Sequence, residues 1–157
     1  MKIKKQLTKG NKMKNNGGFT LLDMLVTVCI VGILASLAAP KVIGYLEIAK
    51  VNTTKAIHSE TVNYISREIM KCSLGESKFM GTNQNCPSSA SKAVTGAVNT
   101  MTSKNPYNGA NKAIVASTSF VPGQVSLSAS GNTVTLKTCT KTGCASSDQL
   151  IETVLVS

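Results

Sequence analysis

The chemical group that stands out most in this chain is the carboxylate of Asp23, near the start of an otherwise uncharged apolar run from Phe19 to Ala39. A carboxylate in hydrocarbon is costly and usually has a partner that compensates its charge. We therefore expect Asp23 to act by pairing with a cation. The alternative is a carboxylate that stays hydrated among lipid head groups.

Five cysteines supply the second candidate chemistry. Cys29 lies in the apolar run and is expected to be a small buried side chain, and the other four can pair in three ways. Proximity in the sequence favours the disulfides Cys72–Cys86 and Cys139–Cys144. A four-cysteine zinc site is the alternative, but no C-x2-C pair is present. Disulfides would indicate an oxidising, extracytoplasmic location.

Little in the sequence supports catalysis. His58 is the single histidine, and no cysteine or carboxylate stands near it at metal-binding spacing. We find neither a nucleotide-binding loop nor a motif of paired carboxylates. We therefore expect a non-enzymatic protein without cofactor or metal, in which His58 is a solvated or packed helix residue.

The element that carries Asp23 is long enough to cross a membrane. As a helix, the 21 residues from Phe19 to Ala39 would extend roughly 31 Å, the thickness of a hydrocarbon core. The preceding residues 1–18 hold six lysines and no acid, which predicts a cytoplasmic N-terminal end. A cleaved secretory signal is the alternative, because Ser36-Leu37-Ala38 offers the small residues that signal peptidase requires.

The segment Gly18-Phe19-Thr20-Leu21-Leu22-Asp23, followed by this apolar helix, resembles the class III signal of type IV prepilins and pseudopilins. The resemblance covers roughly residues 17–72. Gly32 and Pro40 stand at the 14th and 22nd positions counted from Phe19, where many pilins carry this glycine and proline. Two features depart from the common pattern, namely an aspartate where the family usually has glutamate and a leader of 18 residues.

The resemblance implies how the chain is processed. A prepilin peptidase would cut between Gly18 and Phe19 and methylate the new N-terminal Phe19. Asp23 would then lie about 6 Å deeper along the helix, where it can meet the terminal amine of the next subunit in a filament. Removing one partner of such a buried pair costs roughly 3–5 kcal/mol. Pro40 lacks an N–H and, with Gly32, is expected to weaken the helix between them, or only to kink it.

The remainder of the chain predicts an α+β head. From Lys41 to about Lys71 an apolar stripe recurs at helical spacing, made of Ile43, Leu46, Ile57, Thr61, Ile65, Ile69 and Cys72. Residues 79–114 indicate a loop with a short helix near 90–98. Alternating residues around Val125–Ala129 and Val134–Leu136, and the stretch Leu150–Val156, predict strands. We expect a small antiparallel sheet that packs on the helix stripe.

These predictions divide the chain into four parts. They are a cleaved basic leader (1–18), a transmembrane and polymerisation helix (19–40), an amphipathic helix of the head (41–75), and a loop-rich region with the sheet (76–157). The formal net charge of +10 arises mostly from the leader. Residues 73–157 carry six lysines and three acids, so binding of DNA or anionic surfaces, with Lys137 and Lys141, is a minor expectation.

The resemblance implies a structural subunit of a type IV pilus, for motility, adhesion or DNA uptake. Its partners would be further copies in a helical filament, prepilin peptidase, the inner-membrane assembly platform and minor pilins. The subunit would reside in the inner membrane with its C-terminal domain extracytoplasmic, and then in a surface fimbrium. Alternatives are a pseudopilin of type II secretion, a minor pilin, and a signal-anchored extracytoplasmic binding domain that never polymerises.

Overall fold

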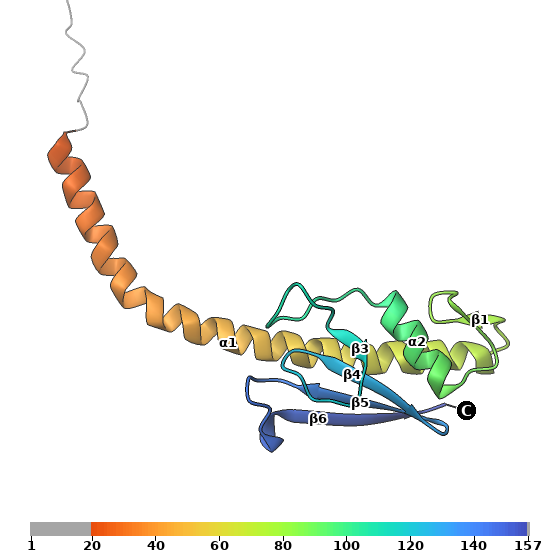
Figure 1. The fold of residues 1–157 in the computed structure, drawn as a ribbon. Helices are drawn as coiled ribbons and strands as arrows, with labels where there is room; N and C mark the ends of the chain where they lie inside the picture. The colour runs from red at the N-terminus through yellow and green to blue at the C-terminus, as the bar shows by residue number, and fades with distance from the viewer. Residues whose placement is uncertain (1–19, 157) are drawn as a thin grey trace, which may run out of the picture. The chain divides into compact units, whose positions relative to one another are not determined.

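The computed structural model describes residues 20–156, which fall into two compact units divided between Lys41 and Val42. The first unit contributes the start of the long helix α1 (Leu21–Ser73). The second unit contains the rest of α1 and all other elements (Figure 1). The predicted parts 41–75 and 76–157 therefore fold together, while the leader 1–18 lies outside the described residues.

The second unit is built from one further α-helix and short strands. They are β1 (Lys78–Phe79), β2 (Gln84–Asn85), α2 (Ala90–Thr100), β3 (Ile114–Ala116), β4 (Val125–Ser130), β5 (Thr133–Cys139), the short 3-10 helix η1 (Ser146–Asp148) and β6 (Gln149–Leu155). The predicted short helix near 90–98 is α2, whose start is capped by the Ser89 side chain accepting a hydrogen bond from Lys92 N.

The main sheet has four strands in the order β3-β4-β5-β6. Strands β4, β5 and β6 are antiparallel, and Gly131 and Asn132 form the two-residue turn that places Ser130 opposite Thr133. Gly131 has a positive φ, which suits such a turn. The expected sheet is confirmed for these strands, but β3 pairs with β4 in parallel. Residues 79–114 also hold the small β1–β2 ladder, where only a loop and a helix were predicted.

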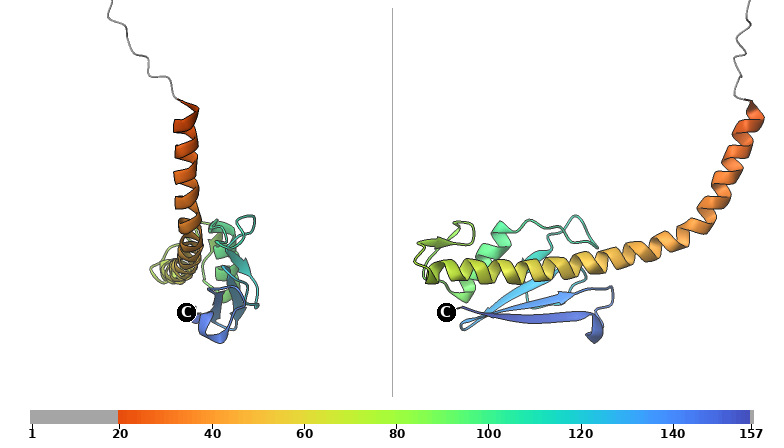
Figure 2. Two further views of the ribbon diagram at one scale, coloured as in Figure 1. Left: turned by 90° about the vertical axis from the view of Figure 1, so that its left-hand side faces the viewer. Right: turned by 180° about the vertical axis from the view of Figure 1, so that it is seen from behind.

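The core of the second unit lies between α1 and the sheet. Ile57, Ile65 and Ile69 of the helix are buried in one cluster with residues of α2 and of the inward sheet face, among them Val125, Leu127, Val134 and Leu136. Figures 1 and 2 show this part of α1 lying lengthwise along the sheet. The fold is thus α+β, with a long N-terminal helix packed on a small sheet.

The predicted helix stripe is correct only in part. Ile57, Thr61, Ile65 and Ile69 are buried, as expected. Ile43 and Leu46 are wrong as core residues, because they are 68% and 55% exposed. The first fully buried residue of α1 is Thr54, whereas the turns just before it are only partly covered. Residue spacing along the helix predicts which side is apolar, but it does not predict at which residue that side becomes buried.

Candidate functional site

The candidate site is the exposed apolar start of α1. Large apolar side chains cover every side of this helix and are 46% to 86% exposed. These are Leu21, Leu22, Met24, Leu25, Val26, Val28, Ile30, Val31, Ile33, Leu34 and Leu37. A helix that is apolar all round belongs in a membrane or in a protein core. By length and composition this helix can cross a membrane.

Exposure of these apolar side chains to water is energetically unfavourable. A large aliphatic side chain left in water forgoes roughly 1.5–3 kcal/mol relative to a buried one. No described residue from another element covers these side chains, since all of Leu21–Lys41 is exposed. The helix therefore needs lipid or other protein chains around it. Cys29 belongs to the same surface, where it is a free and exposed thiol rather than the buried side chain expected from the sequence.

Asp23 is held at the start of this helix by Thr20. Its Oδ2 atom accepts hydrogen bonds from Thr20 Oγ1 at 2.8 Å and Thr20 N at 3.2 Å. In return, Asp23 N lies 3.3 Å from Thr20 Oγ1, to which it donates. This reciprocal arrangement is a capping box with aspartate in place of glutamate. The negative charge also lies at the positive end of the helix dipole.

Within the described residues, the capping box uses one of the two carboxylate oxygens of Asp23. Both bonds from Thr20 go to Oδ2, and among residues 20–156 no hydrogen bond goes to Oδ1. Gly18 and Phe19, the predicted processing residues, lie outside the described residues. The expected meeting of Asp23 with an amine of another subunit therefore stays a prediction.

Gly32 and Pro40 both lie inside α1, which is continuous from Leu21 to Ser73. Pro40 has no N–H to donate to the carbonyl of Ser36, so one helical hydrogen bond is missing. The Ser36 hydroxyl donates to Ile33 O at 2.8 Å. A Cβ atom added to Gly32 would meet no atom within 4 Å. The weakening of this stretch stays a prediction.

Two disulfides fasten the second unit. Cys72 pairs with Cys86 at a Cα–Cα distance of 5.6 Å, and Cys139 pairs with Cys144 at 5.4 Å. These are the two pairings that proximity favoured. The first ties the last turn of α1 to the end of β2, and the second closes the chain just after β5.

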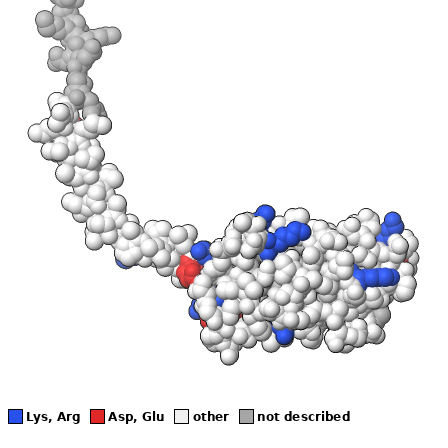
Figure 3. All heavy atoms as spheres, viewed as in Figure 1, with Lys and Arg blue, Asp and Glu red and all other residues white. Residues whose placement is uncertain are grey.

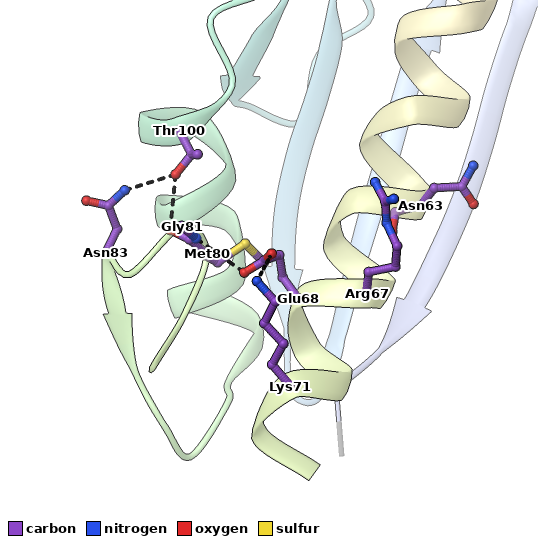
Figure 4. Close-up of polar contacts among 8 residues, drawn as sticks. All are labelled: Asn63, Arg67, Glu68, Lys71, Met80, Gly81, Asn83 and Thr100. Atoms are coloured by element: carbon purple, nitrogen blue, oxygen red, sulfur yellow. Dashed lines mark hydrogen bonds and ion pairs between the residues drawn. The ribbon is translucent and has the colours of Figure 1, made fainter. Parts of the chain in front are cut away.

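Glu68 holds the β1–β2 turn against α1 (Figure 4). Its carboxylate accepts hydrogen bonds from Lys71 Nζ and, at 3.2 Å, from Gly81 N. Burial raises the pKa of Glu68, but these hydrogen bonds and the charge of Lys71 outweigh it, so the pKa lies below its ordinary value. Thr100 Oγ1 adds a hydrogen bond to Met80 O at 3.2 Å.

His58 is packed rather than solvated, and it joins the helix to the sheet. Its Nδ1 lies 2.9 Å from Thr138 Oγ1, and its Nε2 lies 3.2 Å from Glu152 Oε2. Neighbours in the sequence gave no sign of this carboxylate, which is 94 positions away. Among the described residues, no group of three or more His, Cys, Asp or Glu side chains could hold a metal ion.

Tyr107 makes a second link between α1 and the C-terminal part of the chain. Its hydroxyl donates to Thr140 O at 2.7 Å and lies 3.1 Å from Glu47 Oε1, while Lys50 Nζ is 5.3 Å from the ring centre. Burial, followed by the hydrogen bond and charge of Glu47, raises the pKa of Tyr107 to about 12. The phenol therefore keeps its proton at neutral pH.

The lysines considered for nucleic-acid binding have partners within the protein. Lys137 Nζ lies 5.6 Å from the centre of the Phe120 ring, and Lys141 Nζ lies 3.5 Å from Asp148 Oδ1. Figure 3 shows the basic side chains of residues 42–156 at several separate places on the face in view. This distribution gives DNA binding no added support.

Comparison of the chain with protein-family models, with curated proteins and with solved structures finds no match.

Proposed function

We propose that this protein is the structural subunit of a type IV pilus, a prepilin that is cleaved after Gly18 and polymerised through its N-terminal helix. The observation that carries the proposal is an uncovered apolar helical segment whose single acid, Asp23, is fixed in its first turn. Such a helix is suited to two surroundings in turn, first lipid and then a bundle of identical helices.

Processing would supply the missing cation. Cleavage before Phe19 creates a positively charged amine four residues ahead of Asp23, and methylation of this amine keeps its charge. In a filament of axially displaced copies, the Oδ1 atom of Asp23 would accept a bond from the amine of a neighbour, while Thr20 continues to hold Oδ2. The pair would fix the axial register of the helices, because a shifted neighbour leaves both charges unpaired in an apolar bundle.

The second unit would then form the outer part of the fibre. Its disulfides suit an oxidising compartment. Prepilin peptidase, the inner-membrane assembly platform and minor pilins would be its partners, and the subunit would pass from the inner membrane to a surface fibre that serves motility, adhesion or DNA uptake. A type II secretion pseudopilin and a minor pilin share the same assembly chemistry.

The deciding experiment compares Asp23→Ala with Asp23→Glu in cells that make the protein. We expect Asp23→Ala to insert into the membrane normally but to abolish or sharply reduce fibres in sheared preparations. The Asp23→Glu variant keeps the charge and should retain fibres. Because alanine also removes the capping box, Thr20→Val serves as a control that disturbs the cap but leaves the carboxylate.

Normal fibre numbers in Asp23→Ala would overturn the role of Asp23. Sequencing the mature N-terminus tests the class of protein, since a methylated Phe19 supports the filament subunit. A mature chain that begins at Ala39 would instead identify a cleaved signal and an unpolymerised domain. Imaging with an antibody against residues 76–157 separates long surface pili from a short periplasmic pseudopilus.

A further inference from the structure

The strand β6 forms a free edge of the main sheet. The sheet order ends at β6, which among residues 20–156 pairs only with β5. Figures 1 and 2 show no other described element beyond this strand on its outer side. The opposite edge, β3, has three residues, whereas β6 has seven. A long free edge presents unpaired backbone N–H and C=O groups that can pair with another strand.

The sequence of β6 has only one of the features that oppose such pairing, the charge of Glu152. Edge strands are usually protected by lysine, proline or a bulge. Strand β6 reads Gln-Leu-Ile-Glu-Thr-Val-Leu and pairs with β5 without interruption. Its single charge, Glu152, is in contact with His58. Ile151 and Leu155 are 61% and 76% exposed, so the edge is apolar as well as unpaired.

We propose that β6 pairs with β6 of a second copy of this chain, antiparallel and centred on Thr153. This register sets Ile151 of each copy opposite Leu155 of the other, on the face of the strand opposite to that of Glu152. Apolar and Thr–Thr pairs across neighbouring strands stabilise a sheet. Glu152 lies opposite Val154 in this register, so the two carboxylates do not face each other. The strand thus matches itself in apolar side chains and brings no two like charges directly opposite each other.

An adjoining groove offers further apolar surface to the same partner. It lies between the last turns of α1 and the end of β6 and has a volume of about 240 Å³. Ile69, Met70, Val154 and Leu155 line it together with two serines. A strand added to β6 would cover the Val154 and Leu155 side of this groove. A groove between a helix and an edge strand is a common place for strand addition.

The two-fold symmetry of the pair also sets how the two helices run. Strand β6 runs lengthwise along residues 42–73 of α1 in both views (Figures 1 and 2), so a two-fold axis through Thr153 also reverses this part of the helix. A two-fold contact closes on itself and does not propagate.

Cysteine cross-linking of the full chain in detergent micelles tests the register directly. All variants carry Cys29→Ser to remove the free thiol. In an antiparallel pair, opposite Cα atoms are about 4.5–5.5 Å apart, within the range of roughly 4.4–6.8 Å that a disulfide needs. We expect Thr153→Cys to give a disulfide-linked dimer on mild oxidation. Ile151→Cys and Leu155→Cys should each stay monomeric alone and cross-link when differently tagged samples are mixed.

Matched variants separate this contact from chance encounters. Ile151→Lys places a charge on the edge and should abolish the Thr153→Cys dimer, whereas Ser59→Lys, on an exposed turn of α1, should leave it intact. Thr135→Cys, which lies beside Thr153 on β5, should not cross-link. Equal dimer yields from Thr153→Cys and Ile151→Cys would overturn the proposal, as would a Thr153→Cys chain that stays monomeric.

The proposal does not depend on pilus assembly. Asp23→Ala should lose fibres but keep the Thr153→Cys dimer, so the two ideas fail separately. A Thr153→Cys chain that links to a cysteine at Val115 of β3, and not to itself, would mean that the edge joins copies head to tail and would also overturn it.

Discussion

His58 Nδ1 lies 2.9 Å from Thr138 Oγ1, a contact that joins α1 to β5 across 80 positions of the sequence. Both side chains are buried. Replacing His58 with alanine leaves the Thr138 hydroxyl without this partner and opens a cavity. A buried polar group without a partner costs roughly 1–3 kcal/mol.

We therefore expect His58→Ala to lower the free energy of unfolding of the second unit by at least this amount. Urea unfolding of the full chain in detergent micelles, followed by circular dichroism, measures the loss. Ser59→Ala, at the exposed neighbouring position, should change stability little. Equal stability of the two variants would contradict the structural role of His58.

Gly96 of α2 is packed against Met80 without room for a side chain. A Cβ atom at this position would overlap the Cβ and Cγ atoms of Met80. Met80 is fully buried and has a positive φ, so it cannot move aside freely. Gly96→Ala should cost roughly 1–3 kcal/mol, as overpacked cores do.

The matched control is Gly109→Ala, because a Cβ atom there meets nothing within 4 Å. Thermal unfolding should show a lower melting temperature for Gly96→Ala alone. A Gly96→Ala chain as stable as the parent would mean that α2 can shift away from the β1–β2 turn.

Glu68 should make the second unit sensitive to acid. Its pKa is lowered in the folded chain, from an ordinary value near 4.5, so the folded state binds the proton less readily than the unfolded state. The stabilisation is present above the ordinary pKa and is lost as pH falls through the lowered folded value. Glu68→Gln should remove this part of the pH dependence.

Unfolding measured at a series of pH values between neutral and acid would show the difference. Glu60, exposed on the same helix, provides the control, and Glu60→Gln should leave the slope unchanged. A Glu68→Gln chain with the slope of the parent would contradict the prediction.

The two disulfides should contribute unequally. The Cys72–Cys86 bridge closes a loop of 14 positions and Cys139–Cys144 a loop of five. In the chain-entropy model these are worth on the order of 3 and 2 kcal/mol respectively. We expect the Cys72→Ala, Cys86→Ala double variant to lose more stability in urea than the corresponding pair at 139 and 144. The reverse order would show that local packing outweighs loop length.

Local sequence patterns predicted the helices and strands better than they predicted the contacts between them. The apolar run gave α1, and the alternation around Ser130-Gly131-Asn132 gave the β4–β5 hairpin. Spacing also favoured the cysteine pairs that the structure contains. Each of these signals depends on residues close together in the chain, where period and turn chemistry act directly.

The features that were missed depend on distant residues. Glu68 and His58 are polar positions on a helix, and only the fold brings Gly81 and Glu152 to them. Strand β3 is three residues long and pairs in parallel, so it has too little alternation to be recognised. Ile43 and Leu46 fit the apolar stripe, but nothing in the local sequence shows that both stay exposed.

The Cys72–Cys86 bridge also affects how damage to this protein would be seen. Residues 73–85 lie between its two ends, and most of them are exposed. A protease that cuts there leaves the two fragments covalently joined, so the nicked molecule keeps its size on a gel until a reductant separates them. The disulfide at the end of α1 therefore keeps the two fragments in one molecule when the backbone is cut in this exposed segment.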